Sequence, residues 1–238
     1  MDLPVVSIII PAHNEEALLG ATLDALRAAA AGLAEPHEIV VVDDSSTDRT
    51  AAIARDRGAR VVRSEAHQIA AARNAGARGA AGGLLVFVDA DTLVSAEVLR
   101  AAVGTLRAGA VGGGAMAVFE PEAPRWAHRA IAVAAWIMRK AQWAPGCFIF
   151  ARRDAFEAAG GFDERYFASE EIHLSRALKR RGRFVVLHDS VVTSARKAEH
   201  YSMSHSLWLM VRMLWLPSLR RREGLEFWYT RHDKTKKS

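Results

Sequence analysis

Short apolar runs alternate with segments of helical periodicity through the first half of the chain. The runs cover residues 5–10, 38–42, 59–62 and 84–88 and predict buried strands. Between them, apolar positions at helical spacing predict helices over residues 15–31, 51–57 and 66–80. This order predicts an α/β fold built on a doubly wound, mainly parallel sheet with right-handed crossovers.

The pattern is less regular after residue 90. It predicts helices over residues 95–107, 123–140 and 169–181, and strands over 110–119, 147–151 and 184–187. Gly112-Gly113-Gly114 lies within one of these strands and indicates either a plain bend or the close approach of another backbone or a ligand. Residues 203–219 are mostly apolar and predict a C-terminal helix, which either packs on the domain or lies in a membrane interface.

Composition favours one domain in a reducing compartment. Half of the 238 residues are hydrophobic, which is enough for a full core. Cys147 is the single cysteine, so an internal disulfide is excluded. We see no signal peptide and no apolar stretch as long as a membrane span. A cytoplasmic protein is therefore expected.

The formal net charge is +5, and its excess lies mainly in the C-terminal third, at residues 179–181, 220–222 and 234–237. Such a surface can be without specific role. A basic end beside apolar sequence can also attract anionic lipid, which predicts peripheral contact with the inner face of the membrane through the C-terminal segment. No helix-turn-helix, zinc-finger or RNA-binding signature is present, so a nucleic-acid partner is not expected.

Two aspartates, Asp89 and Asp91, follow the apolar run 84–88 directly. Ligands of open α/β sheets bind outside the carboxyl ends of the strands. Two carboxylates at that place suit a hard divalent cation that carries substrate phosphates. The simpler interpretation is a strand-ending turn, which Asp also favours.

Polar residues also follow the first two predicted strands, at 11–16 and 43–48. All three strand ends should meet at one sheet edge, where oxygen acceptors can bind a base or ribose. Glycine-rich phosphate fingerprints are absent, which excludes a Rossmann dinucleotide site and a P-loop. Arg73 lies on the helix before the 84–88 strand and is either a solvated charge or faces the nucleotide and its phosphates.

A second acidic pair, Glu170 and Glu171, opens the helix predicted over residues 169–181. Acids there suit the helix dipole. The pair also follows the turn at residues 160–164, which can direct the chain toward the sheet edge. A carboxylate held there could take a proton from an acceptor hydroxyl as general base.

Together these segments resemble the family 2 inverting glycosyltransferases, which have the GT-A, nucleotide-diphospho-sugar transferase fold. The resemblance covers about residues 5–196. It is carried by the opening strand and loop Ser7 to Glu16, the Asp-Asp-x-Ser-x-Asp-x-Thr segment from Asp43 to Thr50, Arg73-Asn74-x-Gly76, Phe87-Val88-Asp89-Ala90-Asp91, and Gly160-Gly161-Phe162-Asp163-Glu164 followed by Ser169-Glu170-Glu171.

The resemblance implies metal-dependent, inverting and non-processive transfer of a hexosyl group from a nucleotide-diphospho-sugar to a hydroxyl acceptor, for example a lipid-linked or envelope glycan. Asp89 and Asp91 would hold Mg²⁺ or Mn²⁺, and Glu171, where the family usually has Asp, would be the catalytic base, with Glu170 as the alternative. The residues implied to bind the nucleotide sugar are Pro11, His13, Glu15, Asp43, Asp44, Arg73, Asp89 and Arg196.

The segment 191–196 resembles a bacterial subset of the family, and His188 is either a further metal ligand or a hydrogen-bonded histidine. The expected organisation is a glycosyltransferase domain over residues 1–198, followed by a C-terminal helix and basic tail over 199–238. Residues 1–110 would bind the nucleotide sugar and 111–198 the acceptor. The alternatives are a polyprenyl-phosphate sugar transferase, a nucleotidyltransferase and a non-catalytic nucleotide-sugar-binding protein.

Overall fold

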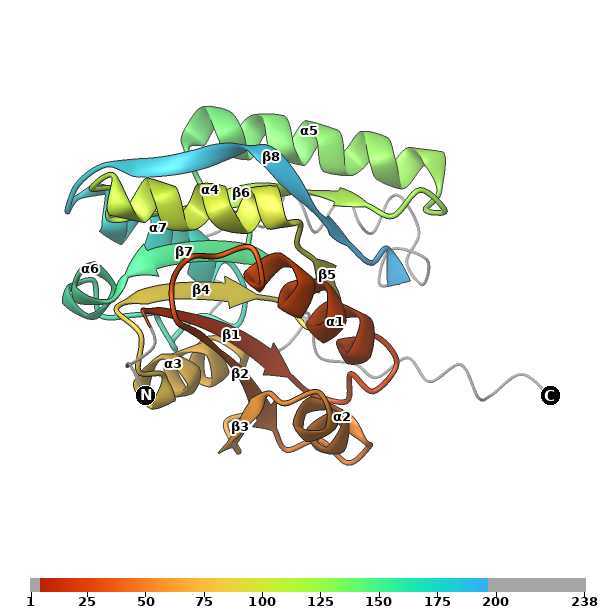
Figure 1. The fold of residues 1–238 in the computed structure, drawn as a ribbon. Coiled ribbons are helices and arrows are strands. Elements are labelled where there is room, and N and C mark those ends of the chain that lie inside the picture. The colour runs from red at the N-terminus through yellow and green to blue at the C-terminus, as the bar shows by residue number, and fades with distance from the viewer. Residues whose placement is uncertain (1–4, 197–238) are drawn as a thin grey trace.

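One mixed sheet organises residues 5–196, the part of the chain that the computed structural model describes (Figure 1). Its strand order is β3-β2-β1-β4-β7-β6-β8-β5. The strands are β1 (Val6–Ala12), β2 (His37–Asp44), β3 (Arg60–Ser64), β4 (Leu84–Val88), β5 (Thr92–Leu93), β6 (Gly112–Phe119), β7 (Phe148–Arg152) and β8 (Phe184–Thr193). The helices are α1 (Leu19–Ala30), α2 (Thr50–Asp56), α3 (Ile69–Gly79), α4 (Ala96–Arg107), α5 (Arg125–Ala141), α6 (Arg153–Ala158) and α7 (Glu170–Lys179).

The first half of the sheet is parallel, as the alternation of strands and helices predicts. β1 pairs in parallel with both β2 and β4, and β2 pairs in parallel with β3. The second half is mixed, because β7 runs antiparallel to β4 and β6 whereas β6 and β8 are parallel. The carboxyl ends of β1, β2 and β4 therefore share one edge, and the start of β7 lies beside the end of β4.

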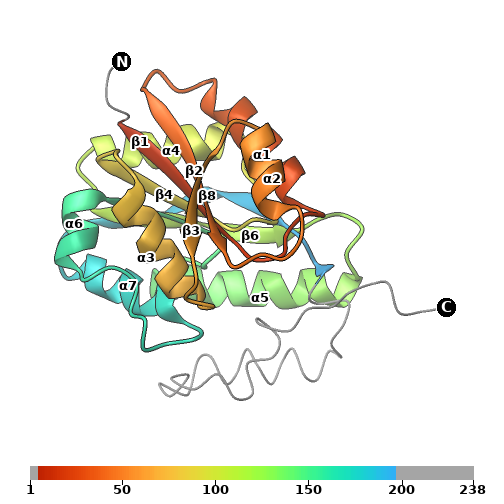
Figure 2. The same cartoon turned by 90° about the horizontal axis from the view of Figure 1, so that it is seen from below.

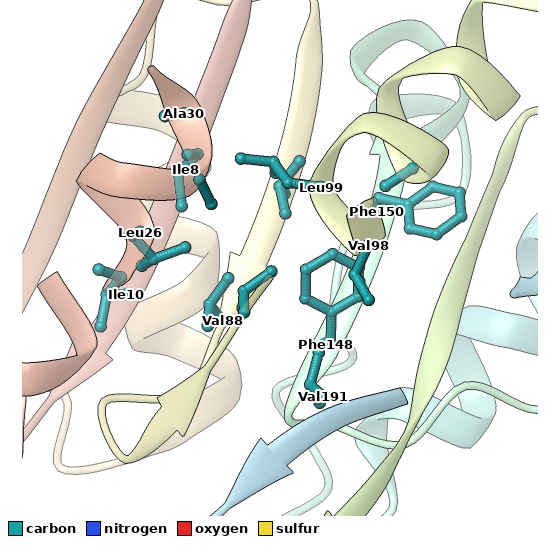
Figure 3. Close-up of a cluster of buried hydrophobic side chains, with 14 of the residues drawn as sticks. Ile8, Ile10, Leu26, Ala30, Val88, Val98, Leu99, Phe148, Phe150 and Val191 are labelled. Carbon is teal, nitrogen blue, oxygen red and sulfur yellow. The ribbon is translucent and has the colours of Figure 1, made fainter. Parts of the chain in front are cut away.

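Both faces of the sheet are covered, which explains why the strands read as continuous apolar runs rather than alternating ones. On one face, Ile8 and Ile10 of β1 point toward Leu26 of α1, and α4 packs over Phe148 and Phe150 of β7 (Figure 3). The opposite face is covered by α3, α6 and α7. Figure 2 shows the helices on either side of the sheet.

Several sequence predictions need correction in detail. The first helix begins at Leu19 rather than at residue 15, because the loop before it is bound to the loop after β2, where Glu15 N donates to Thr50 Oγ1 at 2.8 Å. β8 extends to Thr193, since it pairs with β5 as well as with β6. The pattern did not predict β5 or α6, which span two and six residues.

The glycines of β6 lie in tightly packed backbone. A Cβ at Gly113 would collide with the carbonyl oxygen of Val185 on β8 and with the ring of Phe150 on β7. Close approach of another backbone is therefore confirmed for the triple glycine, and the pairing of β6 with β8 also shifts register between Gly114 and Met116. This packing lets β6 lie between β7 and β8 at the centre of the second half of the sheet.

The predicted C-terminal helix, the basic tail and the membrane contact through them lie outside the described residues. Within residues 5–196, no helix is long and apolar enough to cross a membrane.

Candidate functional site

The loops after β1 and β2 are joined by hydrogen bonds at the carboxyl edge of the sheet. The Nδ1 atom of His13 lies 2.6 Å from the carbonyl oxygen of Asp44. Asn14 N donates to Ser46 Oγ at 3.0 Å. These bonds bring together the first two of the three strand ends that the sequence singles out, as their parallel pairing requires.

The third strand end, at residues 89–91, is a turn whose backbone is held from two directions. Thr22 Oγ1 of α1 donates to the carbonyl oxygen of Ala90 at 2.8 Å, and Ser194 N donates to that of Asp91 at 3.2 Å. Burial and the charges of Asp89 and Asp91 raise the pKa of the Cys147 thiol, so both carboxylates act on one neighbouring side chain. The turn thus holds its two carboxylates in a fixed relation.

Arg73 is buried beneath this edge, with 1% of its surface exposed. Its Nη1 donates to Glu170 Oε1 at 2.7 Å, and its Nη2 donates to Asp89 Oδ1 at 2.7 Å and to the carbonyl oxygen of Gly146 at 2.8 Å. Burial alone would lower the pKa of Arg73, but its ion pairs with Asp89 and Glu170 outweigh burial and raise that pKa above its ordinary value. The solvated-charge interpretation is therefore wrong, and Arg73 links the two acidic groups.

The acidic pair begins α7 and is buried. Ser169 before it adopts a left-handed backbone conformation with φ of 66°, which turns the chain into the helix. Burial raises the pKa of Glu170, against the opposing charge of Arg73. Burial, and next the charge of Glu170, raise the pKa of Glu171 to about 8. Near neutral pH the pair therefore retains a proton, since two adjacent buried carboxylates resist ionising together.

The turn that precedes α7 is bound to α3 by an amide that the sequence analysis gave no role. Asn74 Nδ2 donates to the carbonyl oxygen of Phe162 at 2.8 Å, and Phe162 N donates to Asn74 Oδ1 at 2.9 Å. Asn74 Nδ2 also donates to Glu164 Oε1 at 2.8 Å. The signal in the sequence for this role of Asn74 is its place beside Arg73 in the motif. An amide buried there can satisfy a backbone donor and a backbone acceptor at once.

The carboxylates of Asp43 and Asp44 accept hydrogen bonds from different segments. Asp43 Oδ1 accepts from Ser46 N at 3.1 Å, within its own loop. Both carboxylate oxygens of Asp44 accept from backbone N–H groups of residues 66–68, at the start of α3. The side chain of Asp44 therefore anchors α3, whereas that of Asp43 orders the loop after β2.

The remaining predicted residues lie at the rim of this edge. Pro11 is buried in β1 and His13 is exposed. Arg196 is bound by Glu15, with its Nη2 at 2.7 and 2.9 Å from the two carboxylate oxygens. This pair joins the segment after β8 to the loop after β1.

His188 lies on β8, with a fully exposed side chain 3.8 Å from Asp189. Residues 5–196 hold no group of three or more His, Cys, Asp or Glu side chains placed for a metal ion. Among the described residues, His188 thus belongs to no such group with Asp89 and Asp91.

Comparisons of the sequence with known proteins, and of the fold with solved structures, agree with the family that the sequence motifs resemble. A profile of Glycosyl transferase family 2 matches residues 7–162. Validoxylamine A glucosyltransferase of Streptomyces hygroscopicus is 38% identical over 103 residues, which make up 41% of this chain and 24% of that protein. Undecaprenyl-phosphate 4-deoxy-4-formamido-L-arabinose transferase of Aeromonas hydrophila is 35% identical over 97 residues, 38% of this chain and 30% of that protein. The chain thus spans less than a third of either relative.

The fold also resembles a solved structure. Mannosyltransferase PcManGT from Pyrobaculum calidifontis, in complex with GDP-Man and Mn²⁺, matches with a TM-score of 0.66 and 24% identity over 89% of this chain and 61% of that one. At this identity the likeness concerns the fold, and it confirms the expected GT-A architecture.

Proposed function

The chain belongs to glycosyl transferase family 2, and from this premise we propose that it transfers a hexosyl group from a nucleotide-diphospho-sugar to a hydroxyl acceptor, with inversion and with a divalent cation. The observation that carries the proposal is the Arg73 bridge. It holds Asp89, on the donor side, and Glu170, beside the predicted base, at 2.7 Å from one guanidinium group.

The donor would bind across the ends of β1, β2 and β4. Asp43, His13 and Pro11 border the place for the base and ribose, and Asp89 and Asp91 border that for the diphosphate. The two carboxylates fit Mg²⁺ or Mn²⁺, because such sites use one or two carboxylates and take their other oxygens from phosphate and water. When bound there, the cation would neutralise charge on the departing nucleoside diphosphate.

Glu171 is the proposed base. Glu170 is less suited to this role, because its Oε1 already accepts a hydrogen bond from Arg73. The acceptor hydroxyl would give its proton to Glu171 while its oxygen attacks the anomeric carbon from the face opposite the diphosphate. The bond from that carbon to the diphosphate oxygen then breaks, and the configuration inverts in one displacement. A pKa of about 8 makes Glu171 a stronger base than an exposed carboxylate.

A polyprenyl-phosphate acceptor is the second candidate. It is favoured by the Aeromonas hydrophila relative, whose name describes a transferase of that kind. A phosphate oxygen already carries negative charge near neutral pH, so this reaction would not need Glu171 as base. The two acceptors therefore differ in whether replacing Glu171 stops transfer.

Binding of the donor tests the proposal directly. Melting temperatures would be measured with UDP-, GDP- and dTDP-sugars, each with and without Mn²⁺. A ligand that binds the native state raises the melting temperature by mass action. One nucleotide class should stabilise the protein in a Mn²⁺-dependent way and release free nucleotide on incubation. Binding without turnover toward water or any supplied acceptor would favour a non-catalytic nucleotide-sugar-binding protein instead.

A further inference from the structure

Helix α5 is amphipathic and carries no acidic residue. Its seventeen residues include three arginines, one lysine and two tryptophans, and only Ala127 is buried. Most helices of this fold bury a whole face against the sheet, but α5 lies along the outer side of β6 and β8 (Figure 1). Its exposed surface therefore needs an explanation of its own.

Six residues of α5 are exposed, and besides Ala132 they form one stripe, here called the α5 stripe: Arg125, Arg129, Val133, Trp136 and Lys140. Their spacings of four, four, three and four residues align them along one line of the helix. Val133 and Trp136, in the middle, are 59% and 64% exposed. Cationic side chains stand at both ends of this apolar centre.

Contacts between α5 and the rest of the domain fix the direction of the stripe. Ile131 packs against the core. Arg139 Nη1 donates to the carbonyl oxygen of Leu187 on β8 at 2.9 Å, and its Nη2 donates to that of His188 at 3.3 Å. These contacts hold the helix to the sheet, so the α5 stripe points outward.

We propose that the α5 stripe docks the protein on an anionic membrane surface. Helices that lie in a lipid interface combine aromatic and apolar residues with Lys and Arg. The apolar centre would enter the head-group region, and the flanking cations would meet lipid phosphates through their flexible stems. No acid on the helix opposes that attraction.

Charge argues against two other occupants. A second copy of the chain docked stripe to stripe would place like charges together. The remaining segment of this chain, residues 197–238, carries nine Arg and Lys against four Asp and Glu and thus lacks complementary charge. An anionic lipid surface supplies an apolar environment for Val133 and Trp136 and negative charge for the cationic residues of the stripe.

Docking through α5 would bring the site to the membrane surface. Residues 142–147 follow α5, and in this loop Gly146 accepts from Arg73 and Cys147 accepts from Asp89 N. Arg176 lies 4.8 Å from the ring centroid of Trp143 and helps to fix the loop. An acceptor carried on a lipid would suit this arrangement, and this last point rests on the proposed function.

Co-sedimentation of the full chain with vesicles tests the docking itself. One vesicle would be phosphatidylcholine alone and the other would contain phosphatidylglycerol, with no donor or acceptor present. The apolar variant is Val133→Ser with Trp136→Ser, and the charge variant is Arg125→Gln, Arg129→Gln and Lys140→Gln. Matched controls are Leu93→Ser with Val118→Ser, which are exposed apolar residues elsewhere, and Arg55→Gln, Arg78→Gln and Arg180→Gln, which are exposed cations elsewhere.

We expect the wild type to bind the anionic vesicles and each α5 variant to bind about tenfold more weakly or worse. Both controls should stay within about twofold of wild type, and the unchanged melting temperature of each variant would show that it is folded. Equal binding by wild type and α5 variants, or absence of wild-type binding, would overturn the proposal. A wild-type dimer that the apolar variant dissociates, without vesicle binding, would assign the stripe to a second copy. These outcomes do not depend on sugar transfer.

Discussion

Arg73 holds Asp89 and Glu170 together, although these acids lie 16 and 97 residues away from it along the chain. Asp89 directly follows strand β4, and Glu170 begins helix α7. One buried guanidinium therefore couples the two halves of the candidate site and neutralises part of the negative charge that the site concentrates.

Replacing Arg73 should destabilise the protein strongly. Arg73→Met leaves Glu170 as a buried carboxylate without its cation, and breaking a buried pair in this way costs about 3–5 kcal/mol. Arg73→Lys keeps the charge but cannot present the planar fork that reaches both acids, so it should also lose stability. Urea unfolding measures both effects. Arg57→Gln, which breaks an exposed pair with Asp24, is the control and should cost less than about 1 kcal/mol.

Asp91→Ala should abolish stabilisation by nucleotide sugar with Mn²⁺ and stop transfer. The variant removes one proposed cation ligand and leaves the Arg73 bridge intact, which makes it a cleaner test than replacement of Asp89. At a donor concentration about a hundredfold above its dissociation constant, binding should stabilise the folded wild type by about 2.7 kcal/mol. The rise in melting temperature measures this stabilisation. Asp56→Ala, at an exposed acid of α2, should keep that shift. A wild-type response in Asp91→Ala would refute the metal assignment.

Glu171→Gln should lower the transfer rate by about 10²–10⁴-fold and leave donor binding unchanged, because the amide cannot accept the acceptor proton. Wild-type kcat should increase as pH rises toward about 8, where the pKa of Glu171 lies. Single-turnover rates between pH 6 and 9 measure this. Glu170→Gln serves as the comparison. Full transfer by Glu171→Gln would remove Glu171 as base and favour Glu170 or a phosphate acceptor.

Glu171→Gln should also change how stability depends on pH. Because the folded-state pKa of Glu171 is raised from 4.5 to about 8, the folded state binds this proton more tightly than the unfolded state does. Wild-type stability from this group is therefore present below about pH 4.5 and is lost as pH rises toward 8. Denaturant unfolding at pH 5, 6.5 and 8 should show a growing advantage of the Gln variant. A difference that stays constant over this range would contradict the buried-carboxylate assignment.

The sequence predicted the parallel half of the fold and the order of the motifs along the chain. Runs such as 84–88 are buried on both faces, so their apolar character alone reveals a strand. It also predicted that Asp43, Asp89 and the loop after β1 share one edge, because parallel neighbouring strands leave no other arrangement. The antiparallel direction of β7 was not predictable, since periodicity describes a strand but not its partner.

By itself, therefore, the sequence determined the family, the α/β class and the residue types that gather at the carboxyl edge of the sheet. These follow from local periodicity and from motifs that are contiguous in the chain. Tertiary structure alone decided that Arg73 is buried between two acids, that Asn74 fixes the turn before α7, and that one stripe of α5 remains exposed. Each depends on contacts between residues far apart in sequence, because burial and charge pairing are set by whichever segments the fold brings together.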